Sequence, residues 1–324
     1  MRPGRPSETG MHRAYFCDDR EVPLPEGHRF PMGKYRRLRE LLIESGLLDP
    51  RRTASAPEVE RARLEAVHDP DYVGAVLGGS LSPEAQRRIG FPWSPALLRR
   101  SLASVGGTLC ATFDALEHGQ ASNLAGGTHH AYRDFGSGYC VFNDLAVAAV
   151  AALESGRARR VLIFDVDVHQ GDGTAALFAG DPRVFTCSLH GERNFPARKQ
   201  RSDLDVPLPD GTGDGAYLQA LEAAWRESLE RGRPDLVLIQ GGVDPFRTQA
   251  YKPQFPLANL LGKWSQGTWK VVISHQLFRF NPDTNLPNPI GTINFARLTL
   301  TRPVLSPNPT GGVNTGTGQI YADE

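Results

Sequence analysis

One short stretch of the chain limits the choice of fold more than any other. Four apolar residues at 161–164, VLIF, lead directly into DVDVH at 165–169. An apolar run of this length, rich in branched residues, predicts a buried strand. Because strand side chains alternate between the two faces, Asp165, Asp167 and His169 are expected on one face. Such groups are costly to bury without a cation or hydrogen bonds, so we expect a metal site, and Zn²⁺ suits oxygen and nitrogen ligands.

Other segments predict an α/β architecture around this strand. Two more apolar runs, Val184–Ser188 and Leu236–Ile239, are typical of strands, and Asp244 follows the second. Helical periodicity appears at Tyr35–Leu42 and Asp214–Leu229, and the alanine-rich segment Asn143–Glu154 favours a buried helix. Strands that alternate with helices predict a mostly parallel sheet covered by helices on both faces. Ligands bind beyond the carboxyl ends of such strands, where both acidic clusters fall, so we expect one shared site.

Composition narrows the class of protein. The 324 residues include 40% apolar and 22% charged residues with no net charge, which argues against nucleic acid or an anionic membrane as the main partner. The four cysteines lie far apart, which favours reduced thiols over a disulfide framework or a cysteine zinc cluster. The polar start lacks the apolar core of a signal peptide, and the longest apolar run is about half a membrane span. We therefore expect a cytoplasmic protein without a membrane partner.

The composition changes near residue 247. Residues 1–246 contain 3 Asn and carry a net charge of −4, whereas residues 247–324 contain 7 Asn, 8 Pro and a net charge of +4. The later segment predicts extended or loop-rich polypeptide. We expect a domain at 1–246 that is incomplete at its C-terminal end. A divergent Asn/Pro/Gly-rich tail at 247–324, fused or poorly ordered, would follow it.

Two glycine-rich segments add candidate site residues. Gly126-Gly127-Thr128-His129-His130 predicts a loop that another group approaches closely, and histidine is the usual general acid or base near neutral pH. By itself the pair also fits one core histidine and one exposed histidine. Gly241-Gly242-Val243-Asp244-Pro245 follows the last predicted strand, although Asp-Pro turns are common without a metal.

In combination, these motifs resemble the zinc-dependent histone deacetylase family, including its bacterial acetoin-utilisation proteins and acetylpolyamine amidohydrolases. Further matching segments are EGHRFPM at 26–32, VHDPDYV at 67–73, GSGYCVFND at 136–144, and SLHGE and NFP between 188 and 196. The resemblance covers about residues 14–246. It implies a three-layer arginase/deacetylase-like α/β fold with an atypical C-terminal part.

The resemblance also implies roles for individual residues. Asp167, His169 and Asp244 would bind Zn²⁺. His130 would be the general base and acid, oriented by Asp172, and His129 its partner, held by Asp165. Gly138, Tyr139 and Phe195 would line a narrow tunnel for an acetylated lysine or acetylated amine. His28, His68 and His190 receive no role.

The chain departs from the family after residue 246. The family places an oxyanion-binding tyrosine beside a glycine-rich turn there, but the remaining tyrosines, Tyr251 and Tyr321, follow no such turn. Loss of one oxyanion donor typically costs about a hundred- to a thousandfold in rate, so impaired turnover is expected. Two alternatives stay open: a non-catalytic acyl-binding remnant and a two-metal arginase-like hydrolase.

Overall fold

The fold is built on a central eight-stranded sheet in the order β2-β1-β3-β9-β7-β4-β5-β6. The computed structural model describes residues 13–28, 30–241, 269–270, 276–279 and 299–300. The strands of this sheet are β1 Arg13–Phe16, β2 Thr53–Ser55, β3 Gln120–Asn123, β4 Val161–Asp165, β5 Val184–Gly191, β6 Leu204–Leu208, β7 Leu236–Gln240 and β9 Gln276–Arg279. A separate pair consists of β8 Trp269–Lys270 and β10 Thr299–Leu300.

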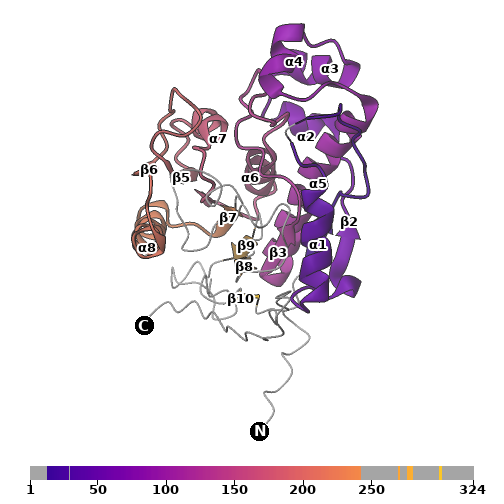
Figure 1. Cartoon of the computed structure of the whole chain (residues 1–324). Coiled ribbons are helices and arrows are strands. Elements are labelled where there is room, and N and C mark those ends of the chain that lie inside the picture. The colour runs from indigo at the N-terminus through magenta and orange to yellow at the C-terminus, as the bar shows by residue number, and fades with distance from the viewer. Residues whose placement is uncertain (1–12, 29, 242–268, 271–275, 280–298, 301–324) are drawn as a thin grey trace, which may run out of the picture.

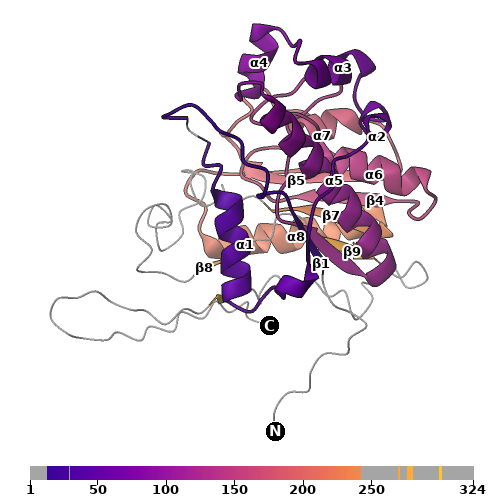
Figure 2. The same ribbon diagram turned by 90° about the vertical axis from the view of Figure 1, so that its right-hand side faces the viewer.

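Helices cover both faces of the sheet (Figure 1). They are α1 Lys34–Glu44, α2 Arg61–Glu65, α3 Pro70–Gly78, α4 Pro83–Ile89, α5 Pro95–His118, α6 Asp144–Glu154, α7 Asp172–Leu177 and α8 Asp214–Gly232, with a 3₁₀ turn at Pro50–Arg52. In the two perpendicular views α3 and α4 lie together at one end of the molecule (Figures 1 and 2). No helix within the described ranges is long and apolar enough to cross a membrane.

Strand β4 belongs to the sheet, which is the middle layer of the three. All five of its residues are buried. Val161 and Ile163 join the apolar cluster that contains the alanine-rich side of α6. Phe164, on the opposite face, packs edge-to-face on Trp225 of α8 with ring centroids 5.1 Å apart. Burial on both faces explains why this segment is an uninterrupted apolar run, and the predicted α/β fold is confirmed.

The sheet is mostly, but not wholly, parallel. The pairs β1–β2, β1–β3, β4–β5, β4–β7 and β5–β6 are parallel. Strand β9 is antiparallel to both neighbours, with Phe278 opposite Gln120 of β3 and Val237 of β7. The predicted tail therefore contributes a strand to the centre of the sheet, while most of its residues, including Tyr251 and Tyr321, lie outside the described residues.

Sequence periodicity does not identify α5, the longest of the described helices, which has 24 residues. The reason is Gly106-Gly107 in its middle, since glycine weakens a helical pattern. Both glycines are buried where α5 packs closely on other segments of the chain. A Cβ atom at Gly106 would collide with the carbonyl oxygen of Pro57, and one at Gly107 would lie 2.9 Å from Oδ1 of Asn123. Close packing therefore overrides helix propensity at this point.

Alanine at position 106 should destabilise the protein in spite of its higher helix propensity. Overpacking costs about 1–3 kcal/mol, which exceeds the gain of about 1 kcal/mol from replacing a helical glycine. Gly74 of α3 is the matched control, because its Cβ would meet only Nη2 of Arg61 at 3.7 Å. Urea unfolding should show a lower free energy of unfolding for Gly106→Ala and a slightly higher one for Gly74→Ala. A higher free energy of unfolding in both variants would contradict the packing explanation.

Candidate active site

The acidic segment after β4 turns rather than continuing as a strand. β4 ends at Asp165, so the predicted alternation of Asp165, Asp167 and His169 along one strand is wrong. Local hydrogen bonds shape the turn instead. The Asp167 amide donates to Oδ1 of Asp165 at 3.0 Å, and the His169 amide donates to Oδ1 of Asp167 at 2.8 Å. These bonds still bring Asp167 and His169 together.

A buried carboxylate holds the histidine loop in place. Asp144, the first residue of α6, accepts hydrogen bonds from the Thr128 amide at 2.9 Å and the Thr128 hydroxyl at 2.7 Å. Its other oxygen accepts from the hydroxyl of Thr108 on α5 at 2.6 Å. The loop is thereby tied to two helices. The local sequence around Asp144 carries no signal for this role, because its partners lie 16 and 36 residues away.

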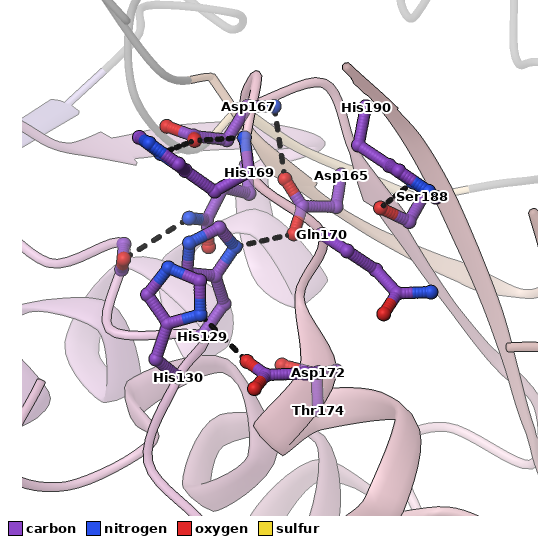
Figure 3. Close-up of polar contacts among 12 residues, drawn as sticks. His129, His130, Asp165, Asp167, His169, Gln170, Asp172, Thr174, Ser188 and His190 are labelled. Carbon is purple, nitrogen blue, oxygen red and sulfur yellow. Dashed lines mark hydrogen bonds and ion pairs between the residues drawn. The ribbon is translucent and has the colours of Figure 1, made fainter. Parts of the chain in front are cut away.

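Two buried histidine–carboxylate pairs lie side by side (Figure 3). Nδ1 of His129 is 2.6 Å from Oδ2 of Asp165, and Nδ1 of His130 is 2.6 Å from Oδ1 of Asp172. The two imidazole centroids are 4.0 Å apart. In each pair Nδ1 donates to a carboxylate, so the other ring nitrogen, Nε2, is free for chemistry. The structure thus brings together the four residues that the resemblance pairs.

The two histidines differ in charge. Burial lowers the pKa of His130 to about 4, aided by the neighbouring His129 and opposed by Asp172. Burial also lowers the pKa of His129, but the charge and hydrogen bond of Asp165 outweigh it and raise the pKa to about 9. At neutral pH the pair therefore consists of one neutral base and one cation. Adjacent groups with opposite shifts are typical of acid–base sites.

Asp167 and His169 present an oxygen and a nitrogen atom close together. Nδ1 of His169 is 2.9 Å from Oδ1 of Asp167. Two donors of a tetrahedral zinc ion lie about 3.3 Å apart when each bond is about 2.0 Å. The two side chains would therefore need to move only slightly away from each other to accommodate the ion. Among the described residues no group of three or more His, Cys, Asp or Glu is arranged to hold a metal. The third predicted ligand, Asp244, lies outside that part of the chain.

The charge of Asp167 also suits a cation. Burial raises the pKa of this carboxyl, but the hydrogen bond from His169 and the charge of His129 outweigh burial and lower the pKa overall. Burial raises the pKa of the neighbouring Asp165. An ionised, buried carboxylate next to an imidazole nitrogen is a donor set that zinc accepts readily.

The predicted tunnel residues lie at the edge of this site. Phe195 packs edge-on against His130 with centroids 4.8 Å apart and is 44% exposed. Gly138 has a φ of 54°, and a Cβ there would lie 2.7 Å from Cδ2 of His130 and 3.2 Å from Phe195. Tyr139 is 38% exposed and packs on Phe91. Phe195 therefore borders the imidazole of His130, whereas the Tyr139 ring lies on Phe91.

The histidines without an assigned role make structural contacts. His68 is fully buried; its Nδ1 donates to the Tyr132 carbonyl at 2.7 Å, and its Nε2 accepts from the Asn143 amide at 3.0 Å. Both contacts require the neutral ring, and burial lowers the pKa of His68 to about 4. His28 lies 3.0 Å from the Gly90 carbonyl, and His190 lies 3.1 Å from the Ser188 hydroxyl.

His68 should make folding stability depend on pH. As the pH falls below 6.5 the unfolded chain takes up a proton that the folded protein refuses until about pH 4, so the free energy of unfolding falls across this window. The full shift corresponds to about 3 kcal/mol. Urea unfolding of His68→Gln should therefore show a shallower decline between pH 6.5 and 4 than the wild type. His118→Gln, at a half-exposed site, is the control; equal slopes for all three proteins would contradict this assignment.

Sequence and structural comparisons agree on the family. A family model described as the histone deacetylase domain matches residues 28–261. The chain belongs to the histone deacetylase family. This match includes all the described site residues and the position of Asp244.

Several relatives share this histone deacetylase region. An uncharacterized protein of Picosynechococcus sp. is 53% identical over 229 residues, which are 71% of this chain and 76% of that protein. The histone deacetylase-like amidohydrolase of Pseudomonas aeruginosa is 34% identical, over 69% of this chain and 63% of that protein. The acetoin utilization protein AcuC of Bacillus subtilis is also 34% identical, over 56% and 52%. The chain thus spans less than two thirds of the latter two proteins.

Solved structures of the family have the same fold. A crystal structure of an HDAC homolog complexed with SAHA superimposes with a TM-score of 0.64 at 25% identity, covering 75% of this chain and 72% of that one. An HDAC homolog from Aquifex aeolicus gives a TM-score of 0.62 at 25% identity, over 72% and 68%. These likenesses support the arginase/deacetylase-like α/β fold.

Proposed function

We propose that this protein is a zinc-dependent deacetylase that hydrolyses the amide of an acetylated lysine or acetylated amine. One observation carries the proposal: the two buried His–Asp pairs lie side by side, each with a 2.6 Å contact, and His130 lies 5.9 Å from the ring of His169. General acid–base groups and candidate metal ligands therefore lie close together (Figure 3). Family membership agrees with this chemistry.

Asp167, His169 and Asp244 are the residues that would hold the zinc ion. The first two present an oxygen and a nitrogen 2.9 Å apart, and both side chains are largely buried. When bound, zinc supplies Lewis acidity toward the acetyl carbonyl and lowers the pKa of water. Three protein ligands would leave a position open for water and substrate.

His130 is the proposed general base and acid. Its Nδ1–H is engaged by Asp172, so Nε2 accepts a proton from the attacking water as the oxygen–carbon bond forms. The same proton passes to the amine nitrogen as the carbon–nitrogen bond breaks, which yields the free amine and acetic acid, and the acid then releases its proton to become acetate. His129, paired with Asp165, is the cation that stabilises the negative charge developing on the carbonyl oxygen.

The exposed aromatic ring beside His130 supports an acylated aliphatic amine as substrate. Phe195 packs edge-on against His130, and Gly138 lies close to both rings without a Cβ atom, which would collide with His130. A neutral acetylated stem would pack on this surface, whereas a free ammonium group would lose hydration. The product amine would therefore leave more readily than the substrate.

The deciding experiment measures acetate release and bound metal in the same sample. Purified protein is incubated with an acetyl-lysine peptide and with an acetylpolyamine, and metal is quantified by mass spectrometry. Turnover with about one zinc per chain is the expected result. Tight substrate binding without turnover would favour the acyl-binding remnant, which the missing oxyanion tyrosine motivates. About two metals per chain would point to an arginase-like hydrolase, and neither metal nor binding would exclude the proposal.

A further inference from the structure

Tyr132 contacts the carboxylate that holds His130. It follows His130 by two residues, and its hydroxyl donates to Oδ2 of Asp172 at 2.9 Å. The other oxygen of the same carboxylate, Oδ1, is 2.6 Å from Nδ1 of His130. One loop thus presents an imidazole and a phenol to the two oxygens of one buried carboxylate.

The scaffold fixes the position of the Tyr132 ring. Its amide donates to the Phe135 carbonyl at 2.8 Å, and its carbonyl accepts from His68 at 2.7 Å. The ring stacks on Phe135 with centroids 4.4 Å apart and an interplanar angle of 17°. The hydroxyl is therefore held in place by the protein alone, before any substrate binds.

Asp172 needs such a partner. Its side chain is 5% exposed, and its backbone amide donates to the Gln170 carbonyl at 2.8 Å at the start of α7. The terminal torsion of aspartate is broad, so a carboxylate with a single partner can rotate. A second charge-assisted hydrogen bond fixes its plane and satisfies an oxygen that would otherwise be buried without a partner.

We propose that Tyr132 is a positioning residue of the deacetylase reaction: its hydroxyl fixes the plane of the Asp172 carboxylate, which in turn holds the Nδ1–H of His130. This inference rests on the proposed function in that His130 is taken as the base. The consequence is that Nε2 of His130 keeps one direction toward the reacting amide. A misaligned base loses rate without losing substrate affinity.

The kinetic test is Tyr132→Phe, which removes only the hydroxyl and keeps the ring on Phe135. We expect kcat to fall about ten- to a hundredfold, as for other partners behind a functional side chain, with KM and zinc content unchanged. Tyr15→Phe is the matched control, because its hydroxyl also donates to a carboxylate, Oδ2 of Asp114 at 2.8 Å, but joins β1 to α5. A merely structural tyrosine would behave like this control, with lower stability and an unchanged kcat.

A spectroscopic readout separates this inference from the proposed function. In metal-free protein labelled with ¹⁵N-histidine, the Nδ1–H proton of His130 is identified by its loss in His130→Gln. Tyr132→Phe should move this resonance, while the corresponding resonance of His129 and both resonances in Tyr15→Phe stay in place. An unmoved His130 resonance would overturn the inference, even in an active enzyme. A moved resonance in a protein without turnover would retain the positioning role and reject only the deacetylase reaction.

Discussion

Replacing Asp167 with alanine is expected to empty the metal site and abolish acetate release while the protein stays folded. Loss of a group that hydrogen-bonds to a metal ligand typically lowers metal affinity about 10- to 100-fold. Loss of a ligand itself should lower it by more than that. The fold should survive because β4 ends at Asp165, before this residue. The site therefore depends on Asp167 far more than the core does.

Zinc content and circular dichroism measure this prediction directly. Asp114→Ala is the control, since it removes a carboxylate that binds the Tyr15 hydroxyl away from the site. It should keep both zinc and turnover. If Asp167→Ala retained wild-type zinc, the assignment of the metal ligands would be wrong, whatever its activity.

Replacing His130 with glutamine is expected to lower kcat by about a hundred- to ten-thousandfold, the usual contribution of a general acid–base group. The amide of glutamine can still donate to Asp172, so the buried carboxylate keeps a partner. Zinc content should not change, because His130 is not a proposed ligand. The loss should therefore appear in the chemical step and not in metal binding.

The comparison with His129→Gln makes this prediction specific. Burial and the neighbouring charge keep His130 neutral, whereas Asp165 keeps His129 protonated. Only a neutral imidazole can accept a proton, so His130→Gln should lose more activity than His129→Gln. Equal losses, or a larger loss for His129→Gln, would falsify the division of roles between the two histidines. His118→Gln, at the half-exposed end of α5, controls for histidine removal in general.

Much of the sheet could be predicted from local patterns. The apolar runs predicted β4, β5 and β7 to within a few residues, because each of these strands is buried on nearly every position. Helix α6 begins after Asn143, whose side chain accepts from the Ala146 amide, as its alanine-rich pattern suggests. Helix α5 was not predicted, because its two central glycines serve contacts with segments distant in sequence.

The candidate site was likewise predictable from the sequence only in part. Local spacing pointed to Asp165, Asp167 and His169, and the family resemblance paired the two histidines with Asp165 and Asp172. Neither pointed to Asp144 or Tyr132, which hold the histidine loop and the Asp172 carboxylate. Their residue types are ordinary, and their importance lies in partners that the chain brings close only on folding.

The sequence alone determined that this protein has a buried parallel strand followed directly by carboxylates and an imidazole, since periodicity and burial cost are local properties of the chain. The tertiary structure decided which groups meet. His129 reaches Asp165 across 36 residues, and His130 reaches Asp172 across 42. It also decided that the two imidazoles differ in charge, because a pKa depends on burial and on neighbouring charges that packing alone supplies.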